Sequence, residues 1–284
     1  GMESIIRLPA TQTDKEMAQG DLRRVLEIAQ FGVEATGYVL FSGRKLVDDI
    51  YVIHGDFDTW AYEQLGLIVY CDELWDVRAR SGKDYVELSS MNKKNDLKGL
   101  EEVEAAVLQW NDEVLQGEGF VDWRSFEHPQ LGRVEIGGWK RLLRNNAPPQ
   151  LLEETCAKMT RFLLAHAQAA PKLRAEFYRV ELLGENTYRI AVAVRNDGYL
   201  PTNVTEQALK VKRARPLEAR IDLGLEDELL VGREREEIGH LHGYGGRRKV
   251  EWVVRFAGAA SAKVEIAGQR AGVVRLDLRD ALNP

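Results

Sequence analysis

Glu73 is the residue whose type and position best suit proton transfer. It follows Leu67–Tyr70, a continuous apolar run that predicts a strand buried on both faces of a parallel sheet. In open α/β sheets, ligands bind beyond the carboxyl ends of the strands, so a carboxylate there is expected to point into a site. A partly desolvated glutamate at that position can act as a general base. The alternative is that Glu73 is a solvated strand end.

The five histidines are the first candidates for metal ligands. His240 and His242 form the best pair, because residues i and i+2 share one face of a strand. Their spacing fixes no third or fourth ligand, and the alternative is a polar strand edge or loop. His54 could contact a substrate, His128 is expected to form hydrogen bonds in a loop, and His166 is expected to pack on a helix face.

Aromatic residues stand at fixed distances before Glu73. Tyr51, Trp60, Tyr62 and Glu73 follow the pattern Tyr-x8-Trp-x-Tyr-x10-Glu. This pattern resembles the last catalytic segment of zinc metallocarboxypeptidases of the carboxypeptidase A type. Further segments in the same order also resemble bacterial members of that family, namely SIIRLPATQTDKEM, ATGY and WRSFEHPQLGRVEIGGW. The resemblance covers residues 4–170 and implies a partial carboxypeptidase-like α/β/α sheet domain.

The resemblance also implies roles for three residues. In that family a mobile tyrosine, here Tyr51, covers the C-terminal carboxylate of the peptide substrate, and a glutamate, here Glu73, activates the zinc-bound water. Asp58, two residues before Trp60, lies where the family often carries its side-chain specificity residue, and an aspartate there would favour a basic terminal residue. The alternative for Asp58 is a helix N-cap.

The zinc ligands of the family have no matching residues in this chain. The family binds zinc through a His-x-x-Glu pair and a distant histidine, and that histidine precedes the strand matching Ser4–Leu8. The arginines that hold the substrate carboxylate also belong to the portion that is absent. A catalytic zinc site needs three protein ligands and one open position. Zinc is therefore the cofactor of the family, but we expect none to bind to this chain alone, and we expect the chain alone to be inactive.

Helices and strands alternate up to residue 170, as in α/β proteins. Helices are expected at 21–36, with Asp21 as N-cap and Gly37 as C-cap, and at 59–65, capped by Asp56 or Asp58 and closed by Gly66. Further helices are predicted at 100–115 and 151–169. Strands are expected at 50–53, 67–70 and 133–136, the last one stopped by Gly137-Gly138.

After Pro171 the helical periodicity disappears and short alternating runs such as YRIAVAVRN and VEWVVRF follow. Turn signals separate them at intervals typical of sandwich strands. We therefore predict two domains, a C-terminal portion of a carboxypeptidase-like α/β domain at 1–170 and an accessory all-β, immunoglobulin-like sandwich at 171–284.

The charge distribution argues against nucleic acid as a partner. Residues 1–170 carry a net charge of −9 and residues 171–284 a net charge of +3, whereas phosphate binding needs cationic surface. The run Arg247-Arg248-Lys249 is short and predicts a turn and strand start instead of a binding patch. No apolar run has the length of a membrane span, so no membrane partner is expected.

The two cysteines, Cys71 and Cys156, imply no disulfide framework. Cys71 follows a buried run and is expected to pack in the core. The first residues lack the basic and apolar regions of a signal peptide, so a cytoplasmic location is predicted.

Two classes of function remain open. In the first, the chain is the C-terminal part of a zinc carboxypeptidase that hydrolyses C-terminal residues from peptides. In the second, it is a non-catalytic module, derived from a peptidase scaffold, that binds a protein, peptide or glycan. A sheet cut in its middle would expose apolar faces. We therefore expect a second copy, a missing N-terminal half or the β-domain to cover them.

Overall fold

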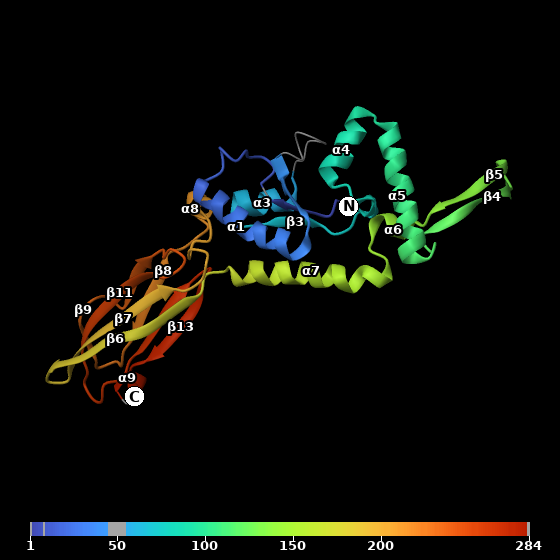
Figure 1. Ribbon diagram of the computed structural model, residues 1–284. Coiled ribbons are helices and arrows are strands. Elements are labelled where there is room, and N and C mark those ends of the chain that lie inside the picture. Colours follow the sequence, from blue (N-terminus) through green and yellow to red (C-terminus); the bar gives the residue numbers. More distant parts are fainter. Residues whose placement is uncertain (1, 8, 45–54, 283–284) are drawn as a thin grey trace. The chain divides into compact units, whose positions relative to one another are not determined.

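The computed structural model describes residues 2–7, 9–44 and 55–282 of the chain (Figure 1). It contains helices and several sheets, and it divides into two compact units that each combine separate stretches of sequence. The first unit consists of Gly1–Arg7, Ala29–Tyr51 and Tyr70–Leu163. The second unit consists of Leu8–Ile28, Val52–Val69 and Leu164–Pro284. Each unit is described by itself below.

The first unit contains a three-stranded sheet with the order β2-β1-β3. Its strands are β1 (Ser4–Arg7), β2 (Val39–Ser42) and β3 (Tyr70–Glu73). β1 pairs with β2 in parallel and with β3 in antiparallel orientation. The prediction of a fully buried parallel strand at Leu67–Tyr70 was therefore wrong, because β3 begins at Tyr70, is half-buried and runs antiparallel to its neighbour.

The late start of β3 follows from the end of the preceding helix, α3 (Phe57–Leu65). Gly66 adopts a left-handed conformation, and its N–H donates to the carbonyl of Tyr62 at 2.8 Å. The N–H of Leu67 donates to the carbonyl of Ala61 at 3.1 Å. The first bond is that of an αL C-cap, and the second ties Leu67 back to the last turns of the helix. Leu67 therefore belongs to the helix end and is not available to a sheet.

Helices make up most of the remaining first unit. They are η1 (Val77–Ser81), α4 (Tyr85–Lys94), α5 (Leu97–Leu115), α6 (Arg141–Asn145) and α7 (Pro149–Gln168). The predicted helices at 100–115 and 151–169 are thus confirmed, with earlier starts. The core that these elements share contains Trp75, Val77, Leu88, Val103, Val107, Leu115 and Leu143.

A two-stranded hairpin follows α5 and consists of β4 (Phe120–His128) and β5 (Gly132–Trp139) (Figure 1). It contains the predicted strand at 133–136, but Gly137-Gly138 does not stop that strand. The pairing is irregular near Trp123 instead. A Cβ on Gly137 would lie 2.7 Å from the Cα of Trp123, so this bulge requires a glycine.

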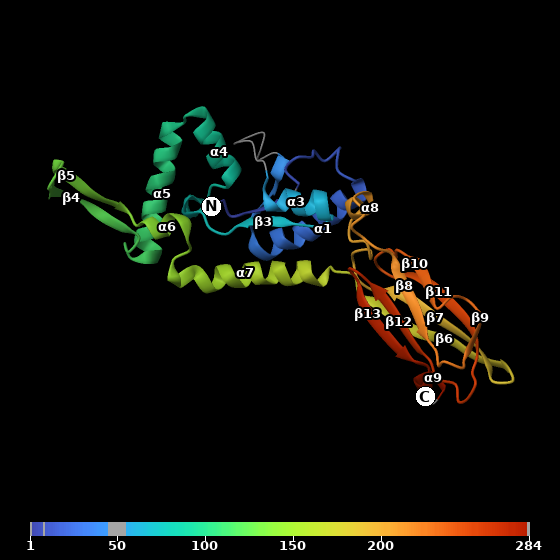
Figure 2. The same ribbon diagram turned by 180° about the vertical axis from the view of Figure 1, so that it is seen from behind.

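The second unit contains two four-stranded antiparallel sheets (Figure 2). One has the order β6-β7-β11-β9 and the other the order β10-β8-β12-β13. The strands are β6 (Leu173–Gly184), β7 (Thr187–Asn196), β8 (Leu217–Asp222), β9 (Glu228–Val231), β10 (Arg235–Gly239), β11 (Gly246–Arg255), β12 (Lys263–Gly268) and β13 (Gly272–Asp277). Both sheets contribute to one apolar core around Trp252, Ile190 and Ile266. Two short helices accompany the strands: α8 (Glu206–Lys210) lies between β7 and β8, and α9 (Leu278–Leu282) follows β13.

The helix α1 (Gln19–Thr36) begins two residues earlier than predicted. Asp21 is therefore not its N-cap. The buried carboxylate of Asp21 instead accepts the backbone N–H groups of Glu206 and Gln207, at 2.7 and 3.0 Å, and so caps the start of α8. At the other end of α1 the prediction is confirmed, because Gly37 is left-handed and its N–H donates to Val33.

None of the helices within the described ranges combines the length and the apolar composition that a membrane crossing requires.

Candidate functional site

Glu73 is the last residue of β3 and lines a cavity of about 600 Å³ in the first unit. It is half-buried and lies opposite Ser4 of β1 in the sheet register. The residues from 72 to 75 form one wall of the cavity, and the loop at 145–147 forms another. The carboxylate that the sequence singled out therefore lies at a hollow large enough for a small ligand or a peptide end.

The helix α7 supplies the remaining wall. The residues that it contributes are Leu152, Thr155, Cys156, Met159 and Thr160. They repeat at intervals of three and four, so they lie on one side of the helix. The sequence predicted this helix but gave no sign that this side of it faces Glu73.

The backbone just after Glu73 is held by side chains from distant segments. The hydroxyl of Tyr38 donates to the carbonyl of Leu74 at 2.5 Å. Burial raises the pKa of Tyr38 to about 12, so the hydroxyl remains a donor at neutral pH. The indole Nε1 of Trp75 donates to the carbonyl of Leu143 at 2.8 Å. These bonds fix the direction in which the chain leaves β3.

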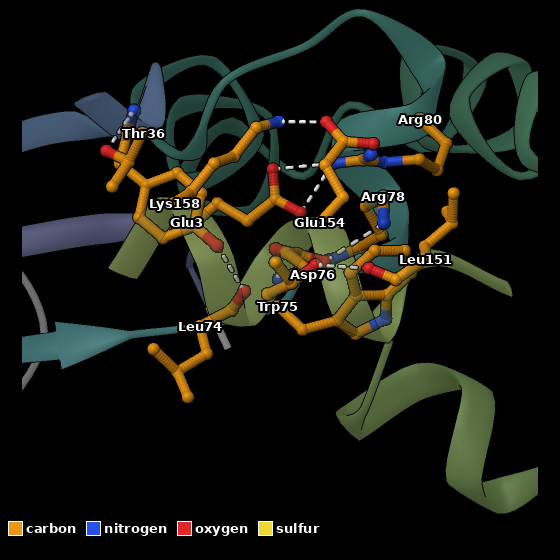
Figure 3. Close-up of polar contacts among 12 residues, drawn as sticks. Glu3, Thr36, Leu74, Trp75, Asp76, Arg78, Arg80, Leu151, Glu154 and Lys158 are labelled. Atoms are coloured by element: carbon orange, nitrogen blue, oxygen red, sulfur yellow. Dashed lines mark hydrogen bonds and ion pairs between the residues drawn. The ribbon is translucent and has the colours of Figure 1, made fainter. Parts of the chain in front are cut away.

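Charged pairs surround the next turn (Figure 3). The carboxylate of Asp76 caps η1 and also pairs with Arg78, with 2.8 Å between Oδ2 and Nη2. Arg80 donates to both carboxylate oxygens of Glu3, and its guanidinium lies 4.8 Å from the centre of the Trp75 ring. Burial raises the pKa of Glu3, and the charge of Arg80 opposes that shift. The network ties β1 to the turn beyond Glu73.

The cavity lining offers carboxylate, hydroxyl, thiol and apolar groups. Asp72 and Glu73 provide the charge, Cys156 is a free thiol, and Leu152 and Met159 provide apolar surface. Among the described residues that line it, none is a lysine, an arginine or a histidine. The arrangement can accept a proton and can receive a neutral or cationic group, and it offers no described cation for a substrate carboxylate.

The other two site residues predicted from the sequence are placed differently. Tyr51 lies outside the described residues, as does His54. Asp58 lies in the first turn of α3, in the second unit, and is half-buried. Burial raises the pKa of Asp58, and the nearby carboxylate of Asp56 adds to the shift. The cap of α3 is Asp56, which accepts the N–H of Thr59 at 2.7 Å, so the rival role of Asp58 as an N-cap was wrong.

The described histidines have local structural roles. His128 is the last residue of β4, and its Nδ1 accepts the N–H groups of Gln130 and Leu131 in the turn that follows, so the predicted hydrogen-bonding role is confirmed. Burial lowers the pKa values of His166 and His240. The strand β10 ends at Gly239, before both His240 and His242. The prediction that these two histidines share one face of a strand was therefore wrong.

The residues at hand do not fit a catalytic zinc centre. Across residues 2–7, 9–44 and 55–282, no three His, Cys, Asp or Glu side chains form a group that could hold a metal ion. Such a centre needs three protein ligands. The carboxylate of Glu73 can still accept a proton by itself.

Comparisons with known proteins bear on the second unit alone. Residues 172–279 match a family described as "Domain of unknown function (DUF8731)". The search of curated proteins finds no match to this chain. The matched stretch begins just before β6 and ends within α9, so it contains every strand of the two antiparallel sheets.

Proposed function

We propose that the first unit is the proton-accepting side of a carboxypeptidase-type cleft and that Glu73 is its general base. The observation that carries this proposal is the position of Glu73 at the end of β3, on the wall of a cavity of about 600 Å³. The resemblance of residues 4–170 to zinc carboxypeptidases supplies the reaction, which is hydrolysis of the C-terminal residue of a peptide. In this proposal Tyr51 covers the substrate carboxylate and Asp58 selects a basic terminal side chain.

In this proposal other residues of the chain position Glu73. The Tyr38 hydroxyl and the Trp75 indole hold the backbone that follows Glu73. Leu152 and Met159 of α7 place apolar surface on the cavity wall that Glu73 also lines. In this proposal the zinc ligands come from another segment or chain, as the family resemblance implies. We therefore propose that this chain by itself neither holds catalytic zinc nor cleaves peptides.

The same cavity has exposed apolar residues that another part of the enzyme could cover. Leu74 and Leu152, both lining residues, are 50% and 51% exposed. We propose that the metal-binding half of the peptidase, or a second copy of this chain, covers this apolar rim in the complete enzyme. The fold that we propose is therefore part of a carboxypeptidase-like α/β/α domain followed by an immunoglobulin-like sandwich. The proposed location is cytoplasmic.

One observation favours a second candidate function. The described lining of the cavity contains apolar groups and two carboxylates but no cation. A site of this kind can hold a neutral or basic peptide side chain without any hydrolysis. The alternative is thus a non-catalytic module, built on a peptidase scaffold, that binds a protein, a peptide or a glycan.

Metal analysis and a peptidase assay on the purified chain test the first proposal. We expect substoichiometric zinc and no release of C-terminal amino acids from peptides ending in lysine, arginine or leucine. Stoichiometric zinc together with release of these residues would overturn it.

Peptide titration separates the two candidates. The binding module should bind peptides in the cavity without help, and Met159→Trp, which narrows the cavity, should weaken that binding. Glu153→Gln is the matched control, because Glu153 is an exposed residue of α7 that does not line the cavity. Equal binding by Met159→Trp and the unchanged chain would remove the module from consideration.

A further inference from the structure

Three arginines lie directly opposite one another on adjacent strands of the second unit. Arg174 of β6 pairs with Arg195 of β7, and Arg195 also pairs with Arg247 of β11. Directly opposed residues point to the same face of a sheet. That face is solvent, because Arg195 is exposed while Val194 and Asn196 on either side of it are buried. Like charges in this arrangement repel each other, so the row attracts a counter-charge.

A single carboxylate serves this row. Asp197 forms an ion pair with each of two arginines: its Oδ2 lies 2.8 Å from Nε of Arg174 and its Oδ1 lies 3.1 Å from Nε of Arg195. The terminal Nη groups of both guanidinium ions have no other partner among the described residues, and the same holds for the side chains of Arg247 and Lys172. The row therefore retains a surplus of positive charge and of N–H donors.

A cavity of about 310 Å³ lies against two of these arginines. Lys172, Arg174 and Arg195 line it together with one carboxylate, Glu176. Ala193, two residues before Arg195 on the same strand face, carries only a methyl group and so leaves space beside the row. The rest of the lining is backbone and apolar side chain, from Leu173, Ala175 and Val274.

We propose that this arginine row binds an oxyanion, a phosphate or a carboxylate group carried by a small ligand. Guanidinium ions offer paired N–H donors that match the oxygens of such groups. A volume of about 310 Å³ accommodates an anionic group and a few apolar atoms beside it. This site belongs to the second unit and does not depend on the proposed role of Glu73. Arg174 and Arg195 are far from residues 247–249 in the sequence, so the basic run there did not reveal it.

Calorimetric titration of the full chain tests the site at low ionic strength, where surface charges are little screened. The probes are inorganic phosphate and, separately, acetate, which distinguish a phosphate ligand from a carboxylate ligand. We expect saturable binding of at least one probe with a dissociation constant of about 1 mM or tighter. Arg195→Gln should weaken this binding at least about tenfold, because it removes the middle of the row. Asp197→Asn should tighten it, because it removes the competing carboxylate.

The control is Arg220→Gln. Arg220 is a surface arginine of the other sheet, paired with Asp222 at 2.8 Å and exposed to a similar degree. We expect its removal to leave binding unchanged. Arg247→Gln provides a second test at the end of the row. It should weaken binding less than Arg195→Gln does, because Arg247 does not line the cavity. Absence of saturable binding by both probes would overturn the proposal, and so would equal weakening in Arg195→Gln and Arg220→Gln.

Discussion

The hydroxyl of Tyr62 donates a hydrogen bond to the carboxylate of Asp21, with 3.1 Å between the two oxygens. Both side chains are buried, at 1% and 0% exposed. The same carboxylate accepts the N–H groups of Glu206 and Gln207 at the start of α8. One residue thus joins α1, α3 and the strand-rich part of the chain. The start of α8, which lies between β7 and β8 in sequence, is therefore bonded to helices that precede Glu73 in sequence.

Removal of the Asp21 carboxylate should destabilise the second unit strongly. Asp21→Ala leaves the buried Tyr62 hydroxyl and two partly buried backbone N–H groups without their acceptor, at an expected cost of about 3 kcal/mol. Tyr62→Phe removes one donor only and should cost about 1 kcal/mol. Urea denaturation followed by circular dichroism measures both. Glu226→Ala, at an exposed residue, should change the free energy of unfolding by less than about 0.5 kcal/mol. Equal effects of Asp21→Ala and this control would contradict the assigned role.

Two left-handed glycines at helix ends should respond differently to alanine. Gly66 ends α3 with φ of 63°, and a Cβ there would lie 2.4 Å from the Cα of Ala208. Gly37 ends α1 with φ of 74° and has nothing within 4 Å of that position. Gly37→Ala should therefore cost only the conformational term of about 1 kcal/mol. Gly66→Ala should cost about 3 kcal/mol, because the overlap with α8 adds to that term. Similar unfolding free energies for the two variants would show that α3 and α8 are not in close contact.

The stability of the second unit should fall as the pH is lowered through the range of histidine. Burial lowers the pKa of His166 from its ordinary value of 6.5. Below pH 6.5 the unfolded chain therefore binds a proton that the folded chain does not, and the free energy of unfolding decreases toward the folded pKa. His166→Gln should flatten this part of the profile in denaturation experiments between pH 7 and pH 5. His128→Gln, which retains His166, should keep it. An unchanged profile in His166→Gln would contradict the prediction.

The bond from Tyr38 to the carbonyl of Leu74 should contribute to stability near Glu73. Tyr38→Phe is expected to cost about 1 kcal/mol. The variant should also lose stability less steeply at alkaline pH. Burial raises the pKa of Tyr38 from 10.0 to about 12, so in this range the unfolded chain loses a proton that the folded chain keeps. Denaturation at pH 8 and pH 11 measures both effects. If the two chains lost the same stability between these pH values, the hydroxyl would not be buried as described.

Local signals in the sequence predicted the helices and strands whose ends and faces depend on adjacent residues. Asp56 and Gly66 bound α3, and Gly37 ends α1, because caps act within one helical turn. Alternating apolar residues likewise predicted the strands after residue 171. In β8 the residues Leu217, Ala219 and Ile221 are buried and those between them are exposed. These features depend on a few adjacent residues, so a single sequence is enough to predict them.

Long-range pairings could not be predicted in this way. Asp21 has the residue type of an N-cap, but its partners lie 185 and 186 residues further along the chain. The strand predicted at Leu67–Tyr70 begins later, because the N–H of Leu67 bonds to the last turns of α3. The cavity at Glu73 depends on which side of α7 faces β3, and the arginine row depends on the register of three strands. None of these relations is encoded in local residue patterns.

The most direct test of the account is the activity of the chain when it is combined with a polypeptide that carries the His-x-x-Glu pair and the third histidine of the family. We predict release of C-terminal amino acids by this assembly, and a loss of about 10²- to 10⁴-fold in kcat for Glu73→Gln. Glu153→Gln, on the exposed side of α7, should leave kcat unchanged. Full activity of the Glu73→Gln assembly would contradict the assignment of Glu73 as the general base.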